Sequence, residues 1–136
     1  MENISQSIKC LSDIIEKTAN HKLSAYNITI GQAKILMMLK ETEHISLKNL
    51  EKLFNVTQAT MQGTISRMEK KGYICTVYMA GDKKNKYVVL TEYGRQLSEN
   101  IVKTINDMDQ LLVSSLTDDE AKEFMRILGK MHSSVC

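Results

Sequence analysis

The chain has 136 residues, of which 43% are hydrophobic and 25% charged, as is typical of a single globular domain. It has no proline and three widely spaced cysteines, an odd number that argues against a disulfide framework and for a reducing compartment. No apolar run approaches the roughly 18 residues needed to cross a bilayer, and no signal-like pattern opens the sequence, so we expect a cytoplasmic protein.

The net charge of +2 is distributed unevenly along the chain. Residues 66–91 carry a net charge of +4, whereas residues 1–65 carry +1 and residues 92–136 carry −3. This concentration of positive charge indicates an anionic partner for the middle of the chain.

The first two predicted helices cover residues 3 to about 24 and 30 to about 40. In the first, an apolar stripe repeats at close to 3.6 residues and comprises Ile4, Ile8, Leu11 and Ile15. At the start of the second helix, Thr29 and Gln32 have the spacing of a capping box, with Thr29 as the N-cap. The density of apolar residues in this second helix predicts that it is largely buried.

Residues 46–71 predict a helix, a turn and a second helix. Ser46 is a candidate N-cap for the first helix, which is expected to end near Phe54, and Asn55 begins the turn. Thr57 is a candidate N-cap for the second helix. One side of that second helix is an apolar stripe of Met61, Ile65 and Met68.

The opposite side of this second helix is polar, with a single acid, Glu69, near its end. Short amide and hydroxyl side chains can hydrogen-bond to base edges and phosphates, and a helix N-terminus favours an anion. The polar side therefore indicates nucleic-acid binding. It comprises Gln58, Thr60, Gln62, Gly63, Ser66, Arg67 and Lys70.

Two strands are expected at Tyr73–Met79 and Lys86–Leu90, joined by turn-forming residues 81–85. Lys83, Lys84 and Lys86 cluster at the tip of this hairpin. A solvated turn would explain the cluster by itself, but beside a polar helix the lysines predict one positive surface. Ile45 is expected to add a short third strand.

Two further helices are predicted after the hairpin. Thr91 begins a long helix to about Leu116, and Thr117 and Glu120 have capping-box spacing at the start of the last helix. The stripe of the long helix comprises Leu97, Ile101, Ile105 or Thr104, Met108 and Leu112. The terminal helices could pack on the same subunit or on a second copy of the chain.

Three segments together resemble the MarR (multiple antibiotic resistance regulator) family of winged-helix regulators. They are Val-Thr-x-x-Thr…Ser-Arg-Met-Glu-Lys-Lys-Gly-Tyr-Ile, Gly-Asp-Lys-Lys-Asn-Lys, and Val-Val-Leu-Thr-Glu-Tyr-Gly-Arg. The resemblance implies a mainly α fold with a small β-hairpin wing (α+β), in one domain. Residues 28–91 would form a winged helix-turn-helix lobe, and residues 1–27 and 92–136 would form helical dimerisation regions.

The same resemblance implies a homodimer that binds a pseudo-palindromic DNA operator, most often as a repressor. A recognition helix, 57–71, would enter the major groove, and a wing, 80–87, would reach the minor groove and backbone. Base edges would meet Gln58, Thr60, Gln62 and Ser66, with Gly63 allowing close approach. Phosphates would meet Thr57 and Arg67, and the wing contacts would come from Lys83, Lys84, Asn85 and Lys86. Lys84 stands where the family usually has an arginine, and a lysine lacks the planar fork of a guanidinium.

Other functions find less support in the sequence. The three histidines fall in different predicted elements, and His132 with Cys136 gives too few ligands for a closed metal site, so we expect no enzyme, metal or cofactor. The resemblance also implies a small amphipathic effector where the dimerisation helices meet the winged lobe. Two alternatives stay open: a redox-responsive regulator acting through Cys10, and a winged-helix protein-interaction module without specific DNA binding.

Overall fold

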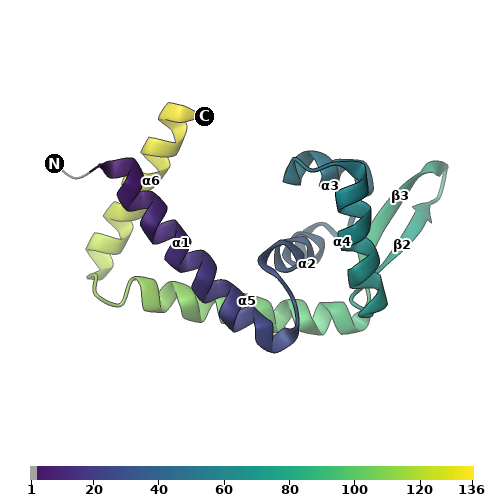
Figure 1. The fold of residues 1–136 in the computed structure, drawn as a ribbon, viewed down its shortest axis with the longest axis horizontal. Coiled ribbons are helices and arrows are strands. Elements are labelled where there is room, and N and C mark those ends of the chain that lie inside the picture. The colour runs from purple at the N-terminus through teal and green to yellow at the C-terminus, as the bar shows by residue number, and fades with distance from the viewer. Residues whose placement is uncertain (1–2) are drawn as a thin grey trace. The chain divides into compact units, whose positions relative to one another are not determined.

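The computed structural model describes residues 3–136, which form helices and one small antiparallel sheet (Figure 1). The elements in chain order are α1 (Ile4–Leu23), the short 3-10 helix η1 (Ser24–Tyr26), α2 (Ile30–Thr42), β1 (His44–Ser46), α3 (Leu47–Phe54), α4 (Gln58–Lys70), β2 (Ile74–Met79), β3 (Asp82–Leu90), α5 (Glu92–Leu112) and α6 (Asp118–Val135). The chain divides into two compact units, one through Thr104 and one from Ile105 onward. The predicted class, mainly α with a β-hairpin wing, is confirmed.

Side-chain caps fix where most of the helices begin. Thr29 and Gln32 form the predicted capping box of α2, and Thr117 and Glu120 form that of α6. The hydroxyls of Ser46 and Thr57 accept hydrogen bonds from backbone N–H groups of α3 and α4. Each cap satisfies a backbone donor that has no partner within its helix, so these boundaries could be predicted from local sequence.

The end of α5 was predicted wrongly, at about Leu116 instead of Leu112. Beyond Leu112 the backbone tightens, because Ser114 and Leu116 donate to carbonyl oxygens only three residues back. The Ser114 hydroxyl also donates to the Leu111 carbonyl oxygen at 2.7 Å. Serine side chains compete in this way with helical hydrogen bonds, and the chain then turns toward the cap of α6 at Thr117.

The three strands lie in the order β1-β3-β2, and both neighbouring pairs are antiparallel. Ile45 in β1 is paired with Val88 in β3, which confirms the predicted third strand. The hairpin itself differs from the prediction, because β3 begins at Asp82 and not at Lys86. The connecting turn is shorter than expected, and an irregularity in the pairing follows Tyr78.

The core of the first unit lies where α2, α3 and α4 pack against the strands. Leu36, Leu50, Met68 and Val88 are fully buried there. In α4 the predicted stripe of Met61, Ile65 and Met68 faces this core, each residue no more than 3% exposed. The polar side of α4 is thereby directed outward. Among the described residues, none of the helices is both long and apolar enough to span a membrane.

Candidate nucleic-acid interface

The helix-turn-helix depends on two local features between α3 and α4. Asn55 adopts a left-handed conformation, with φ of 50°, and ends α3. Asparagine tolerates this conformation better than most residues, which explains its place in the turn. Two residues later, Thr57 caps α4. Its Oγ1 accepts a hydrogen bond from the Thr60 N–H at 3.1 Å, and its hydroxyl donates to Thr60 Oγ1 at 2.9 Å.

The structure places most of the predicted DNA-binding residues of this helix on one accessible surface. Gly63 is half-buried; the exposed residues are Thr57, Gln58, Thr60, Gln62, Ser66 and Arg67. Because Thr57 and Thr60 already bond to each other, these two residues also hold the first turn of α4 in place. The helix therefore offers amides, hydroxyls and one guanidinium to solvent.

Gly63 and Arg67 are closely related in the structure. The guanidinium of Arg67 folds back along α4, where its Nη2 donates to Thr64 Oγ1 at 3.5 Å. A β-carbon added at Gly63 would lie 3.4 Å from Nη1 of Arg67. The glycine thus leaves room for the Arg67 side chain, a use for Gly63 that the sequence analysis missed.

The wing tip, residues 80–87, is held by the carboxylate of Asp82. This carboxylate accepts hydrogen bonds from the backbone N–H groups of Lys84 and Asn85 at 3.2 Å, and from the Asn85 side-chain amide at 3.2 Å. The Tyr87 hydroxyl donates to the same carboxylate at 3.4 Å. The Asn85 hydrogen bonds are the main reason that the pKa of Asp82 is lowered.

We call these hydrogen bonds to the Asp82 carboxylate the clamp. The clamp also explains why the hairpin turn was predicted wrongly. Asp82 pairs with Met79 across the hairpin, so Ala80 and Gly81 make the turn, and Gly81 has a φ of 83°. Residues 83–85 then bulge out before Lys86 pairs with Tyr78. An aspartate after a turn glycine commonly bonds to the backbone two residues on, and this signal could have located the clamp.

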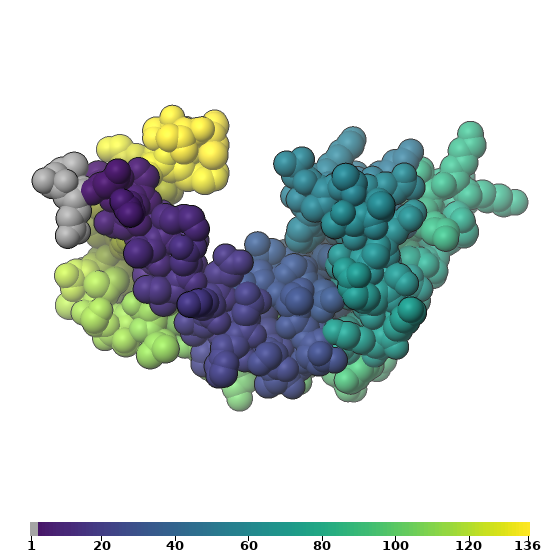
Figure 2. Space-filling view, viewed as in Figure 1, coloured from purple at the N-terminus to yellow at the C-terminus, as the bar shows by residue number. Residues whose placement is uncertain are grey.

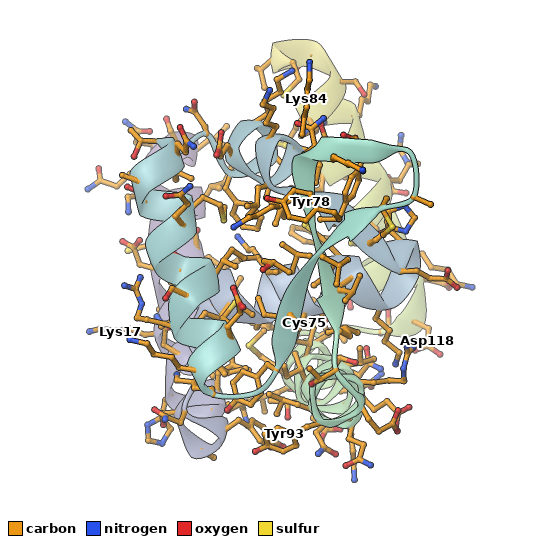
Figure 3. The ribbon with its side chains drawn as sticks, turned by 90° about the vertical axis from the view of Figure 1, so that its right-hand side faces the viewer. Lys17, Cys75, Tyr78, Lys84, Tyr93 and Asp118 are labelled. Carbon is orange, nitrogen blue, oxygen red and sulfur yellow. The ribbon has the colours of Figure 1, made fainter. Side chains whose placement is uncertain are left out.

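The lysines of the wing tip are presented to solvent. Lys83, Lys84 and Lys86 are exposed, whereas Asn85 is half-buried and bonds to Asp82. Figure 2 shows side chains projecting from the tip of the hairpin, and Figure 3 places Lys84 there, far along the strands from Cys75. Asn85 therefore shapes the tip, while the lysines supply its charge.

The basic groups of α4 and the wing tip have no acidic partners in the described part of the chain. The ion pairs there join Lys9 to Asp13 and Arg126 to Glu123, both far from these elements in sequence. Lys71, which follows α4, instead donates to the Asn27 carbonyl oxygen. It thereby joins the end of α4 to the segment between η1 and α2. Since α4 packs against β2 within one compact unit (Figure 1), the unpaired charges of helix and wing belong to one lobe.

The sequence also raised two alternative sites, a metal site near His132 and Cys136 and a reactive Cys10. No group of three metal-binding side chains occurs within residues 3–136. Cys136 and His132 lie 3.5 Å apart on exposed surface. Cys10 is also exposed, but the ammonium of Lys9, its neighbour in sequence, is held by Asp13.

Comparison with known proteins agrees with this geometry. The family model described as MarR family matches residues 28–86, which include α2 to α4 and most of the wing. HTH-type transcriptional repressor YetL of Bacillus subtilis is 26% identical over 123 residues, covering 86% of this chain and 74% of its own. The crystal structure of an S. aureus MepR-DNA complex gives a TM-score of 0.84 at 26% identity and covers 100% of both chains. The crystal structure of a mutant MarR from E. coli, complexed with operator DNA, gives a TM-score of 0.81 at 25% identity, covering 94% of this chain and 92% of that one. Residues 28–86 thus match the MarR family, and most of the chain is similar in sequence and fold to transcriptional regulators of the MarR type.

Proposed function

We propose that this regulator binds a two-fold-symmetric DNA operator as a homodimer and represses transcription there. The observation that carries the proposal is the outward side of α4, where amides, hydroxyls and Arg67 are exposed while Met61, Ile65 and Met68 face the core. A helix anchored in this way can enter a major groove without losing its packing. The relatives are regulators and not enzymes, and we propose no catalytic activity.

In this proposal, residues 28–91 form the DNA-binding lobe and different groups have different roles. Gln58, Gln62 and Ser66 read base edges, because their side chains are exposed and unconstrained by the cap. Thr57 and Thr60 order the first turn and present it to a phosphate. Arg67 contacts phosphate from the last turns of α4.

The wing makes contacts that do not depend on base identity. Lys83, Lys84 and Lys86 neutralise phosphates beside the minor groove, while Asp82 and Asn85 fix the shape of the tip. A lysine at position 84 acts as a point charge and cannot make the bidentate contacts of an arginine. We therefore expect the wing to contribute affinity that is sensitive to salt, and little sequence preference.

Dimerisation would involve residues 1–27 and 92–136, because each compact unit exposes apolar side chains on a terminal helix. In α1, Ile4, Ile8, Leu11 and Ile14 are at least 44% exposed. In α6 no residue is buried, and the exposed large apolar residues are Phe124, Met125, Ile127, Leu128, Met131 and Val135. A second copy of the chain presents the same apolar surfaces, and a two-fold dimer would place two recognition helices about one turn of DNA apart.

A selection experiment tests this function directly. The purified protein is mixed with a pool of random-sequence duplexes at two salt concentrations, and the retained DNA is sequenced. We expect an enriched two-fold-symmetric motif that is lost at the higher salt concentration. Retention without a motif would indicate a non-specific DNA binder. No retention at either salt concentration would contradict the proposal and favour the protein-interaction alternative.

The signal that relieves DNA binding is a separate question. A small amphipathic effector and oxidation of Cys10 are the two candidates, and the exposure of Cys10 keeps the second candidate testable. A Cys10→Ser variant that still lost its operator on peroxide treatment would eliminate the thiol mechanism.

A further inference from the structure

Tyr78 in β2 is a large side chain that its own lobe leaves exposed to solvent. It is 55% exposed, and its hydroxyl takes part in none of the side-chain hydrogen bonds within residues 3–136. The hydroxyls of Tyr26, Tyr73 and Tyr87, by contrast, are all hydrogen-bonded. A ring exposed in this way contributes little to folding, and its hydroxyl is available to a partner.

The pairing of the strands shows which way Tyr78 faces. Directly opposed residues of an antiparallel pair share a face of the sheet, and the faces alternate along each strand. Tyr78 pairs with Lys86, two residues from Val88, which itself pairs with Ile45. Val88 and Ile45 are buried on the face that packs against the helices of the lobe. Tyr78 and Lys86 therefore continue this helix-facing side of the sheet beyond the edge of the core.

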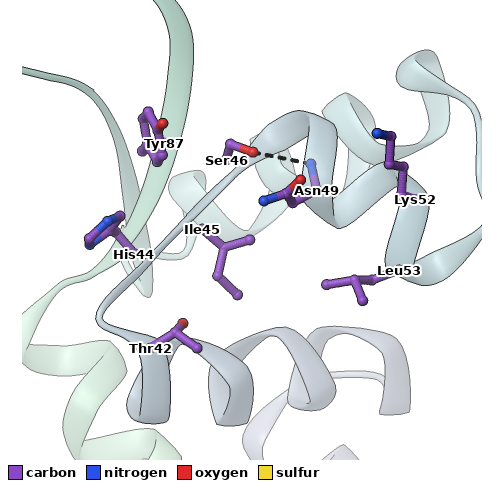
Figure 4. A pocket seen from close by; sticks show the side chains of 8 residues that line it. All are labelled: Thr42, His44, Ile45, Ser46, Asn49, Lys52, Leu53 and Tyr87. Atoms are coloured by element: carbon purple, nitrogen blue, oxygen red, sulfur yellow. Dashed lines mark hydrogen bonds between the residues drawn. The ribbon is translucent and has the colours of Figure 1, made fainter. Parts of the chain in front are cut away.

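The neighbouring tyrosine of β3 lies on the opposite face of the sheet. Tyr87 packs there beside His44 (Figure 4), with ring centroids 5.5 Å apart. Its hydroxyl donates to the Asp82 carboxylate and so belongs to the clamp. Tyr87 thus has partners within the wing, whereas the hydroxyl of Tyr78 is directed away from the clamp.

Tyr78 also lies level with the middle of the recognition helix. The chain leaves α4 at Lys70 and enters β2 at Ile74, and β2 then runs back along α4 (Figure 1). From Ile74 to Tyr78 the strand advances about 13 Å, at about 3.3 Å per residue. The same length along α4, at about 1.5 Å per residue, reaches back from Lys70 to the region of Gln62. Tyr78 is therefore beside the polar side of α4 and below the wing tip, which Lys84 marks in Figure 3.

We propose that Tyr78 donates a hydrogen bond to a phosphate of the DNA strand that passes between the recognition helix and the wing tip. When α4 occupies the major groove and the wing tip the minor groove, the sugar-phosphate strand that separates the two grooves must run between them. Tyr78 and Lys86 lie on the side of the wing that faces α4, so they meet this strand. The inference rests on the function proposed above and adds a contact from the strand of the wing to it.

Tyr78 and Lys86 contribute to DNA binding in different ways. Lys86 is a cation, and a cation that neutralises a phosphate releases a counterion, so its contribution depends on salt. A phenol hydroxyl is an uncharged donor at neutral pH, so the contribution of Tyr78 does not depend on counterion release. Both contacts are made to the backbone and carry no information about base sequence.

Tyr78→Phe tests the contact in the full chain, because it removes the hydroxyl and keeps the ring. Operator affinity, measured by fluorescence anisotropy, should fall about three- to tenfold for each hydrogen bond lost. Affinity for a random duplex should fall by the same factor, and the slope of log affinity against log salt concentration should not change. Lys86→Gln should make this slope shallower. Tyr93→Phe, at a 56% exposed position on α5, is the matched control and should bind as the unaltered protein does.

A methylphosphonate scan of the operator locates the contact. Each phosphate in turn is replaced by a neutral methylphosphonate, which removes the charge that strengthens a hydrogen bond to it. At the phosphate that Tyr78 contacts, the combined loss with Tyr78→Phe should be smaller than the product of the two separate losses, by about twofold or more. At all other phosphates the two losses should multiply.

Three results would overturn the contact. They are equal operator affinity of Tyr78→Phe and the unaltered protein, losses that multiply at every phosphate, and a changed DNA motif in Tyr78→Phe, which would assign the hydroxyl to a base edge. Urea unfolding of Tyr78→Phe separates a binding defect from a folding defect. A protein that binds no operator would contradict the proposed function and this contact with it, whereas an operator bound equally well by Tyr78→Phe would contradict only the contact.

Discussion

The carbonyl group of Tyr73 occupies the space that a side chain at Gly94 would need. A β-carbon built on Gly94 would overlap the carbonyl oxygen and lie 2.8 Å from the carbonyl carbon. Thr91 brings the two segments together, since its N–H donates to the Tyr73 oxygen at 3.1 Å and its Oγ1 accepts from the Gly94 N–H at 3.0 Å. The first turn of α5 is thus fixed directly against the residue that precedes β2.

Gly94→Ala should therefore destabilise the protein, although alanine is normally favoured in a helix. We expect a loss of about 3 kcal/mol in the free energy of unfolding, as for a strongly overpacked site. Urea unfolding monitored by circular dichroism measures the loss. Gly31→Ala is the matched control, because its β-carbon would meet only Thr29 Oγ1, at an ordinary 3.9 Å. Equal stability of the two variants would mean that α5 can shift away from Tyr73 without penalty.

Tyr73 also connects the lobe to the segment after α1. Its hydroxyl donates to the Tyr26 carbonyl oxygen at 3.1 Å, and the Tyr73 side chain is buried. Tyr73→Phe removes this hydrogen bond and should cost about 1 kcal/mol of folding stability. Tyr78→Phe, at an exposed position, should change stability by much less. If both variants were equally stable, the bond to Tyr26 would contribute nothing measurable.

These long-range contacts mark the limit of what the sequence could predict. Caps such as Thr57, and stripes such as Met61, Ile65 and Met68, depend on residues within two helical turns, so their spacing is visible in the sequence. The packing of Gly94 on Tyr73, and the bonds from Lys71 and Tyr73 to residues 26 and 27, join segments separated by 21 to 47 residues. They depend on how the elements pack, which local spacing does not determine.

The candidate interface likewise has one part that local spacing predicts and one part that it does not. The outward residues of α4 follow from the helical period once the buried stripe is known. The wing tip does not, because its shape depends on the backbone groups that Asp82 binds, and a lysine-rich sequence indicates only a polar turn. The position of the Arg67 side chain over Gly63 could not be predicted either, because each residue alone suggested contact with DNA.

Removing the clamp should disorder the wing tip without unfolding the lobe. In Asp82→Asn the side chain keeps one acceptor oxygen but loses its charge, so the amides of Lys84 and Asn85 should exchange with solvent faster. Operator affinity should fall, since three lysines would no longer be held in place. Asp109→Asn, an exposed position on α5, serves as the control. Unchanged exchange at both amides would show that the bulge is stable without the carboxylate.

The clamp should also weaken at low pH. The pKa of Asp82 is lowered, first by the hydrogen bond from the Asn85 side chain, so the ionised carboxylate favours the ordered tip. The stabilisation is complete above the unperturbed value of about 3.9 and is lost as the pH falls through the lower value of the folded protein. Amide shifts of Lys84 and Asn85 should therefore stay constant from neutral pH to about 4 and change only below it. A transition near neutral pH would point to another titrating group.

Arg67→Ala should weaken binding to all DNA sequences to a similar extent. The guanidinium is exposed and has no acidic partner within residues 3–136, so it is available to a phosphate. The slope of log affinity against log salt concentration should become shallower by about one, as expected for loss of one phosphate contact. Lys40→Ala, at an exposed position on α2, should leave the slope unchanged. A change in the preferred motif at constant slope would instead make Arg67 a base-reading residue.

The exposed apolar surface of α6 gives a test of the proposed homodimer. Ile127 and Leu128 are 41% and 39% exposed, and no residue of this helix is buried. Glutamate at both positions would place two charges in an apolar interface, where they have no partner, and should convert the dimer to a monomer in sedimentation experiments. The lobe through Thr104 should remain folded, but operator affinity should fall by roughly tenfold or more, because the benefit of linking two binding sites is lost. Gln110→Glu, at an exposed polar position of α5, controls for added charge. A double variant that stayed dimeric and bound the operator normally would place the dimer interface elsewhere on the chain.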